Sequence, residues 1–87
     1  MFYVYILKSD KDGKSYIGYT KDLRKRIFDH NAKTEQSTKY RAPFKLIYYE
    51  AYLSENDALQ REKSLKRFSG SYTHLKKRIK NSLILFK

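Results

Sequence analysis

Residues 2–19, FYVYILKSDKDGKSYIGY, decide the fold. The first six of them are apolar, and most are β-branched or aromatic, which is typical of a strand. Asp12-Gly13 then supplies turn chemistry, because both residue types accept a positive φ angle. Residues 15–19 form a second strand, so the stretch predicts a β-hairpin. Because side chains alternate along a strand, one face should carry Phe2, Val4 and Ile6, and the other Tyr3, Tyr5 and Leu7.

The residues after the hairpin predict a helix and a third strand. Thr20 is the expected N-cap of a helix over residues 21–31. Leu23 and Ile27, four residues apart, would form its buried stripe. Residues 44–52, FKLIYYEAY, form a long continuous run that we expect to be the central strand.

Two more helices complete the expected order. Ser54 and Asp57 match a capping box for a helix that runs to about Lys66. A last helix is expected over about residues 71–82. The order β-β-α-β-α-α predicts the α/β (α+β) class, with a small three-stranded antiparallel sheet flanked by helices. At this length we expect a single domain over residues 1–87.

Charge is spread unevenly along the chain. The sequence holds 20 Lys and Arg against 9 Asp and Glu, a net charge of +11, and residues 63–87 contain eight bases and no acid. Such an excess attracts polyanions, which favours nucleic acid over an anionic lipid surface or a merely basic exterior. The chain has no cysteine, which excludes disulfides and thiolate metal clusters. It also lacks a signal-peptide pattern and a membrane-length apolar run, so we expect a cytoplasmic protein.

Several segments together resemble a known family. Tyr3-Val4-Tyr5 and Tyr16-Ile17-Gly18 are separated by ten residues, YTKDLRKRIFDH follows at 19–30, and ALQRE occupies 58–62. In this order they resemble the GIY-YIG nuclease family, in particular its small stand-alone branch (UPF0213-like proteins). The first tripeptide departs from GIY at Tyr3. In addition, His74 stands where many relatives carry an asparagine.

The resemblance implies a metal-dependent endonuclease with five catalytic residues. Tyr5 and Tyr16 would orient or activate a water, Arg26 would neutralise the phosphate, and His30 would assist proton transfer. Glu62 would hold one Mg²⁺ or Mn²⁺ ion. On the residues alone, two tyrosines in a hairpin are more often cross-strand packing residues, and that alternative stays open.

Residue chemistry supports parts of this assignment. Arg26 and His30 are four residues apart and share a helix face, and a guanidinium can bind a phosphate through two hydrogen bonds. Gly18 permits close approach of the backbone to substrate or to the neighbouring helix. Glu62 lies four residues after Ala58 and three before Leu65, on the stripe of its helix that should be apolar. Burying an unpaired carboxylate is costly, so it needs an arginine or a divalent cation as partner.

Other residues are expected to bind nucleic acid rather than to catalyse: Tyr19, Lys39, Tyr40, Arg41, Lys76, Lys77 and Arg78. We expect DNA as the substrate, with RNA left open, and structure-directed or weakly sequence-selective cleavage in a DNA repair or processing role. We also expect a monomer without a small-molecule cofactor. The alternatives are a non-catalytic, basic nucleic-acid-binding module and, more weakly, a protein-interaction domain that uses exposed aromatic residues.

Overall fold

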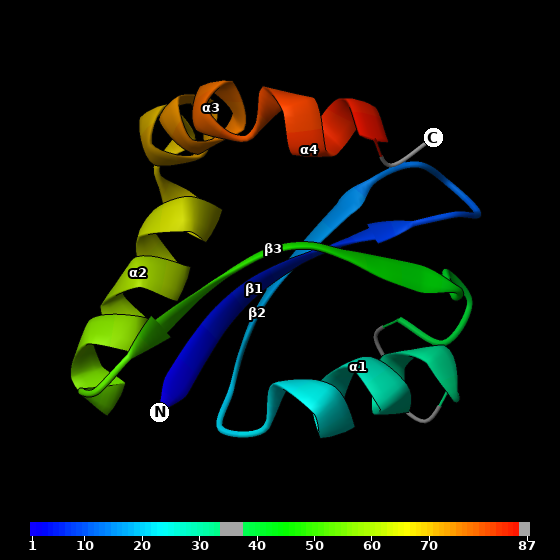
Figure 1. Ribbon diagram of the computed structural model, residues 1–87, viewed down its shortest axis with the longest axis horizontal. Coiled ribbons are helices and arrows are strands. Elements are labelled where there is room, and N and C mark those ends of the chain that lie inside the picture. Colours follow the sequence, from blue (N-terminus) through cyan, green and yellow to red (C-terminus); the bar gives the residue numbers. More distant parts are fainter. Residues whose placement is uncertain (34–37, 86–87) are drawn as a thin grey trace.

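The computed structural model describes residues 1–33 and 38–85. The elements follow the chain in this order: β1 (Phe2–Ser9), β2 (Ser15–Thr20), α1 (Leu23–Asn31), β3 (Phe44–Tyr52), α2 (Glu55–Arg67), α3 (Ser69–Arg78) and α4 (Lys80–Leu85). The strands form one antiparallel sheet with helices against it (Figure 1), which confirms the predicted α+β architecture. Within the described residues, no helix is long and apolar enough to cross a membrane.

The sheet has the order β2-β1-β3, so the prediction that residues 44–52 form its central strand is wrong. The centre is β1, where Val4, Tyr5, Ile6 and Leu7 are all buried, which means that both faces of this strand are covered. β3 alternates between exposed and partly buried residues and lies at one edge. A continuous apolar run does not distinguish a strand buried on both faces from an edge strand with exposed aromatic residues.

The two faces of β1 carry separate cores, as the alternation in the hairpin predicts. Val4 and Ile6 pack with Ala58, Leu65 and Leu75 from α2 and α3. On the opposite face, Tyr5 and Leu7 pack with Ala42 and Phe44, and Leu23 and Ile27 of α1 close over them. Figure 1 shows the sheet passing between α1 on one side and the group of α2, α3 and α4 on the other.

The helix that follows the hairpin begins later than predicted. Asp22, not Thr20, is its N-cap, and the Asp22 carboxylate accepts a hydrogen bond of 3.1 Å from the Lys25 backbone N–H. The Thr20 hydroxyl oxygen instead accepts a hydrogen bond of 3.1 Å from the Asp22 N–H. Thr20 therefore orders the turn that precedes the cap, and both residues contribute to the start of α1.

The first of the two later helices agrees with the prediction at both ends, and the second does not. Ser54 is the N-cap of α2 and accepts a hydrogen bond from the backbone N–H of Asp57. The single helix expected over residues 71–82 is two helices, because regular helical geometry is interrupted at Ile79. In Figure 1, α3 and α4 follow one another along the top of the view, above the sheet.

A polar cluster on the Val4 face joins β3 to α2. Glu50 accepts hydrogen bonds from the phenol groups of Tyr48 and Tyr52 and from the Arg61 guanidinium, whose Nε lies 3.0 Å from Glu50 Oε1. Burial alone would raise the pKa of Glu50, but these hydrogen bonds outweigh it and lower the pKa below its ordinary value. Burial and the same carboxylate raise the pKa of Tyr48 and Tyr52 to about 12. Glu50 is therefore a charged anchor between sheet and helix.

We predict that Glu50→Gln lowers the free energy of unfolding by about 2 kcal/mol at pH 7, because hydrogen bonds to a charged group are lost. A lowered pKa in the folded state stabilises the protein above the ordinary value of 4.5, and that contribution disappears as the pH falls through the lowered pKa. Urea unfolding of both proteins should therefore show a difference at pH 7 that shrinks by pH 3. An equal difference at both pH values would contradict the role given to the charge.

Candidate active site

Tyr5 lies at the centre of the candidate site and is completely buried. Its phenol oxygen is 3.0 Å from Nε2 of His30, and Nδ1 of His30 is 2.7 Å from the hydroxyl oxygen of Thr38. His30 and Thr38 are buried as well. A neutral imidazole offers one donor and one acceptor nitrogen, so His30 can serve both partners at once. These residues form a buried polar chain from the sheet through α1 to Thr38.

Tyr16 lies beside this chain but stays partly accessible. Its ring centroid is 5.0 Å from that of His30 in an edge-to-face arrangement, and Phe44 packs against the same imidazole at 5.7 Å. The Tyr5 and Tyr16 centroids are 6.4 Å apart, so the two predicted tyrosines do converge on one face of the hairpin. Of the two, Tyr16 is the one that a ligand can reach in this conformation.

Gly18 pairs directly with Tyr5 across the hairpin, and the phenol ring lies over it. A Cβ atom at position 18 would stand 2.3 Å from the Tyr5 oxygen and 2.4 Å from its Cζ. Such contacts are far inside van der Waals distance, and the atoms concerned belong to a buried ring that cannot move aside. The predicted close approach at Gly18 is therefore an approach by Tyr5 itself.

The cationic residues of α1 separate into two groups, as predicted. Arg24 and Lys25 are exposed, and Lys25 forms an ion pair of 2.9 Å with Asp29. Arg26 is partly buried, and its Nε atom is buried completely. It stands one helical turn before His30, which places its guanidinium on the same side of α1 as the polar chain.

Glu62 lies in a different layer from these residues. It belongs to α2, which packs against the Val4 face, whereas α1 packs against the Tyr5 face. Its side chain is 21% exposed and its Oε2 atom is 3.1 Å from Nζ of Lys66. Within the described part of the chain, the partner that the structure shows for Glu62 is therefore a lysine, while Arg61 on the same helix is bound to Glu50. Glu62 is half-buried at the margin of the core, between buried Ala58 and Leu65.

Strand β2 connects the two layers. It lies at the edge of the sheet, so Tyr16 and Gly18 face the α1 side while the intervening Ile17 and the following Tyr19 face the α2 side. Tyr19 donates a hydrogen bond of 2.6 Å to Glu55, and the nearby negative charge of Glu62 also raises the pKa of its phenol. Partial desolvation and the bond to Glu55 raise the pKa of Tyr19 to about 12. A ligand bound at the β2 edge could therefore contact residues on both the α1 side and the α2 side of the sheet.

The carboxylate of Glu62 suits one mode of divalent metal binding. Among the described residues, no group of three or more His, Cys, Asp or Glu side chains is arranged to hold a metal ion. Mg²⁺ does not need such a cage, because it is commonly bound by one or two carboxylates, water molecules and substrate phosphates. A partly exposed glutamate whose partner is a flexible lysine fits this mode, whereas a site made only of protein ligands would not fit.

The predicted nucleic-acid-binding residues fall at separate places. Lys39 lies 4.9 Å from the ring centre of exposed Tyr40, and both line a hollow of about 220 Å³ with Lys11, Lys33 and Ala42. Arg41 is instead tied to the hairpin turn, with its Nε 2.7 Å from Asp12, where it lowers the pKa of that carboxyl to about 2. The cluster Lys76, Lys77 and Arg78 is exposed on the last turn of α3, as is His74 one turn earlier.

Three features of the site were not predicted from the sequence. Thr38 lies in a polar segment where nothing marks it as a partner of His30. Phe44 was expected only as the start of a strand, and Arg61 was noted only as part of a motif. The sequence did contain a signal for the role of Arg61. Glu50 lies within a strand, and a carboxylate in a strand that is covered requires a partner.

The comparison with known proteins identifies the class. A family model described as the GIY-YIG catalytic domain matches residues 1–78. The chain therefore belongs to the GIY-YIG family.

Its relatives include UPF0213 proteins of several bacteria. A UPF0213 protein of Staphylococcus saprophyticus is 46% identical over 68 residues, which cover 77% of this chain and 82% of that protein. One from Staphylococcus aureus is 41% identical over 76 residues, covering 86% and 87% of the two chains. The solution NMR structure of a UPF0213 protein from Bacillus halodurans is 37% identical, with a TM-score of 0.48, and the match covers 100% of this chain and 86% of that one.

We predict that Gly18→Ala lowers the free energy of unfolding by about 1–3 kcal/mol, the usual cost of overpacking a core. The new methyl group would have to displace the Tyr5 ring and lengthen its hydrogen bond to His30. Gly70→Ala is the matched control, because nothing lies within 4 Å of a Cβ at that position. Urea unfolding of both variants measures the difference. An unchanged stability in Gly18→Ala would show that Tyr5 does not lie over Gly18.

Proposed function

We propose that this chain is a divalent-metal-dependent endonuclease that hydrolyses phosphodiester bonds in DNA at the edge of strand β2. The observation that carries the proposal is the buried chain of Tyr5, His30 and Thr38 beside the accessible Tyr16. Apolar side chains could fill a small core without the need to pair every buried donor and acceptor, which a buried polar chain imposes. A domain that only docks on nucleic acid has no need of such a chain behind an accessible phenol.

Each residue has a distinct part in the proposed reaction. Tyr16 contacts the attacking water and orients it toward phosphorus. Tyr5 and His30 do not touch the substrate; they fix the position of Tyr16 by packing. Arg26 stabilises the negative charge that develops on the phosphate oxygens.

Glu62 is the proposed ligand for the metal ion. When bound, an Mg²⁺ or Mn²⁺ ion would polarise the phosphate and stabilise the leaving oxygen. Lys66, whose Nζ is 3.1 Å from Oε2, holds the Glu62 carboxylate in place without such an ion. Tyr19, which donates a hydrogen bond to Glu55, lies near it on the α2 side of β2.

Basic surfaces on both sides of the site would hold the DNA backbone. The Lys39 and Tyr40 hollow lies beyond the C-terminal end of α1, and Lys76, Lys77 and Arg78 lie on α3. These contacts are to phosphates and to the faces of bases, which carry little sequence information. We therefore propose cleavage directed by DNA structure or by weak sequence preference, consistent with a role in DNA repair or processing.

We predict that Glu62→Gln and Arg26→Ala each lower the rate of plasmid nicking by at least about 100-fold, because each removes a group that acts on charge in the transition state. Asp57→Asn and Arg67→Ala are the controls. They make the same changes in charge at exposed positions of α2 and should nick at nearly the wild-type rate.

The same four variants separate this function from its main alternative. A nucleic-acid-binding module would bind DNA in a salt-dependent manner and yield no product with any metal. Circular dichroism establishes that each variant is folded, so a loss of nicking can be assigned to chemistry. Wild-type rates in both Glu62→Gln and Arg26→Ala would refute the assignment of the site.

A further inference from the structure

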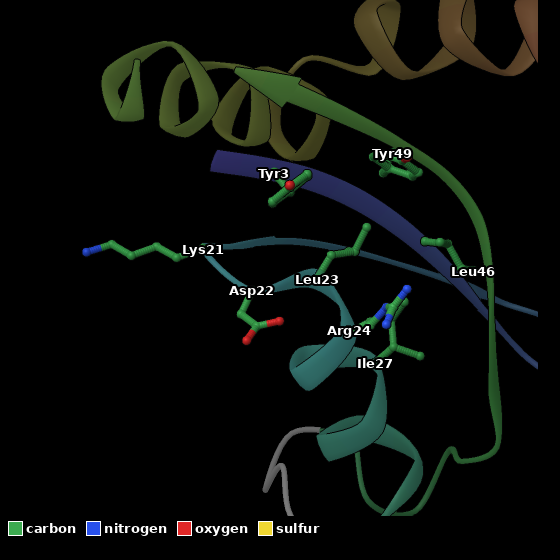
Figure 2. A pocket seen from close by; sticks show the side chains of 8 residues that line it. All are labelled: Tyr3, Lys21, Asp22, Leu23, Arg24, Ile27, Leu46 and Tyr49. Atoms are coloured by element: carbon green, nitrogen blue, oxygen red, sulfur yellow. The ribbon is translucent and has the colours of Figure 1, made fainter. Parts of the chain in front are cut away.

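A pocket of about 570 Å³ lies on the α1 side of the sheet, next to the proposed catalytic residues but separate from them. Strands β1 and β3 form one wall and the start of α1 forms the other, as Figure 2 shows. The lining residues are Tyr3, Lys21, Asp22, Leu23, Arg24, Ile27, Leu46 and Tyr49. Tyr3 precedes Tyr5 by two residues on the same face of β1, so the two side chains start about 7 Å apart.

The walls of this pocket offer flat, apolar contact. The rings of Tyr3 and Tyr49 meet edge to face with their centroids 6.0 Å apart, and Tyr49 is 51% exposed. Leu46 lies beside Tyr49 on β3, while Leu23 and Ile27 approach from α1 (Figure 2). An exposed aromatic face above aliphatic side chains suits a planar ring, because stacking on an aromatic residue is favourable for every type of base.

The rim of the pocket is basic. Lys21 and Arg24 are exposed; Figure 2 shows Lys21 extending away from the pocket and the Arg24 guanidinium directed toward the sheet. Asp22 is the one acid in the lining, and its carboxylate is occupied as the N-cap of α1, 3.1 Å from the Lys25 backbone N–H. A ligand that joins a planar ring to an anionic group could therefore place the ring in the apolar hollow and the anion beside the cations at its rim.

We propose that this pocket binds an unpaired nucleobase of the DNA substrate, stacked on Tyr49, with the adjoining phosphate held by Lys21 and Arg24. The volume admits a single nucleotide and not a duplex, whose bases are already stacked on one another. β2 and β3 lie on either side of β1 in the sheet, so a base stacked on Tyr49 of β3 would lie across β1 from the phosphodiester that the β2 edge would bind. The pocket would thus favour single-stranded, gapped or branched DNA over continuous duplex.

The inference rests on the proposed function only in taking nucleic acid as the ligand, so binding can be tested without cleavage. The probe is a short oligonucleotide that carries 2-aminopurine, either single-stranded or within a continuous duplex, in the presence of chelator. The single-stranded probe should lose fluorescence on binding because the base stacks on Tyr49. Tyr49→Leu should remove this quenching and weaken single-strand binding about tenfold, while Tyr49→Phe should retain both.

Phe28→Leu is the control, because Phe28 is an exposed aromatic residue of α1 that does not line the pocket. It should bind and quench like the wild type. Equal quenching by wild type and Tyr49→Leu, or equal affinity of the wild type for the two probes, would overturn the inference. Cleavage of branched DNA by the same variants, with Mg²⁺ or Mn²⁺ added, separates the two proposals: quenching without cleavage supports the pocket and contradicts the nuclease, and cleavage without quenching does the reverse.

Discussion

The hydrogen bond between Tyr5 and His30 is the constraint on which the rest of the structure depends. It joins the central strand to α1 inside a core formed by few residues, and both partners are completely buried. Three consequences follow from it. Position 18 must be glycine, because the Tyr5 ring lies over it. Tyr16 is held at the surface by the His30 ring. α1 cannot shift along the sheet without leaving buried polar groups without partners, which would be costly.

Much of this arrangement could be predicted from the hairpin. Alternation along residues 2–7 assigns Tyr5 and Val4 to opposite faces, and the spacing of Leu23 and Ile27 predicts one buried stripe on α1. That this stripe covers the Tyr5 face is seen only in the structure. The position of β3 could not be predicted, because the burial that separates a centre from an edge depends on which helices cover it. The role of Thr38 could not be predicted either, because it arises from a contact with His30 across the end of α1. No local sequence pattern encodes that contact.

Some features of the candidate site follow from sequence spacing, and others are determined only by packing in the folded structure. The positions of Tyr16, Arg26 and Glu62 follow from their elements. Packing adds that Tyr5 and His30 are closed to a ligand, that Glu62 lies on the α2 side of the sheet, and that β2 joins the two sides. Tyr5, first expected to act on water, is thereby proposed as a positioning residue. Arg41, which is expected to bind nucleic acid, also anchors the hairpin turn through Asp12.

The central claim is that the wild-type protein cleaves DNA with the help of a metal ion. Its most direct test is to incubate the purified chain with supercoiled plasmid and with branched and linear DNA, in Mg²⁺, in Mn²⁺ and in excess chelator. The account predicts cut product with at least one of the two metal ions and none with chelator. Salt-dependent binding of every substrate without product under any metal condition would contradict it, and would favour a module that only binds nucleic acid.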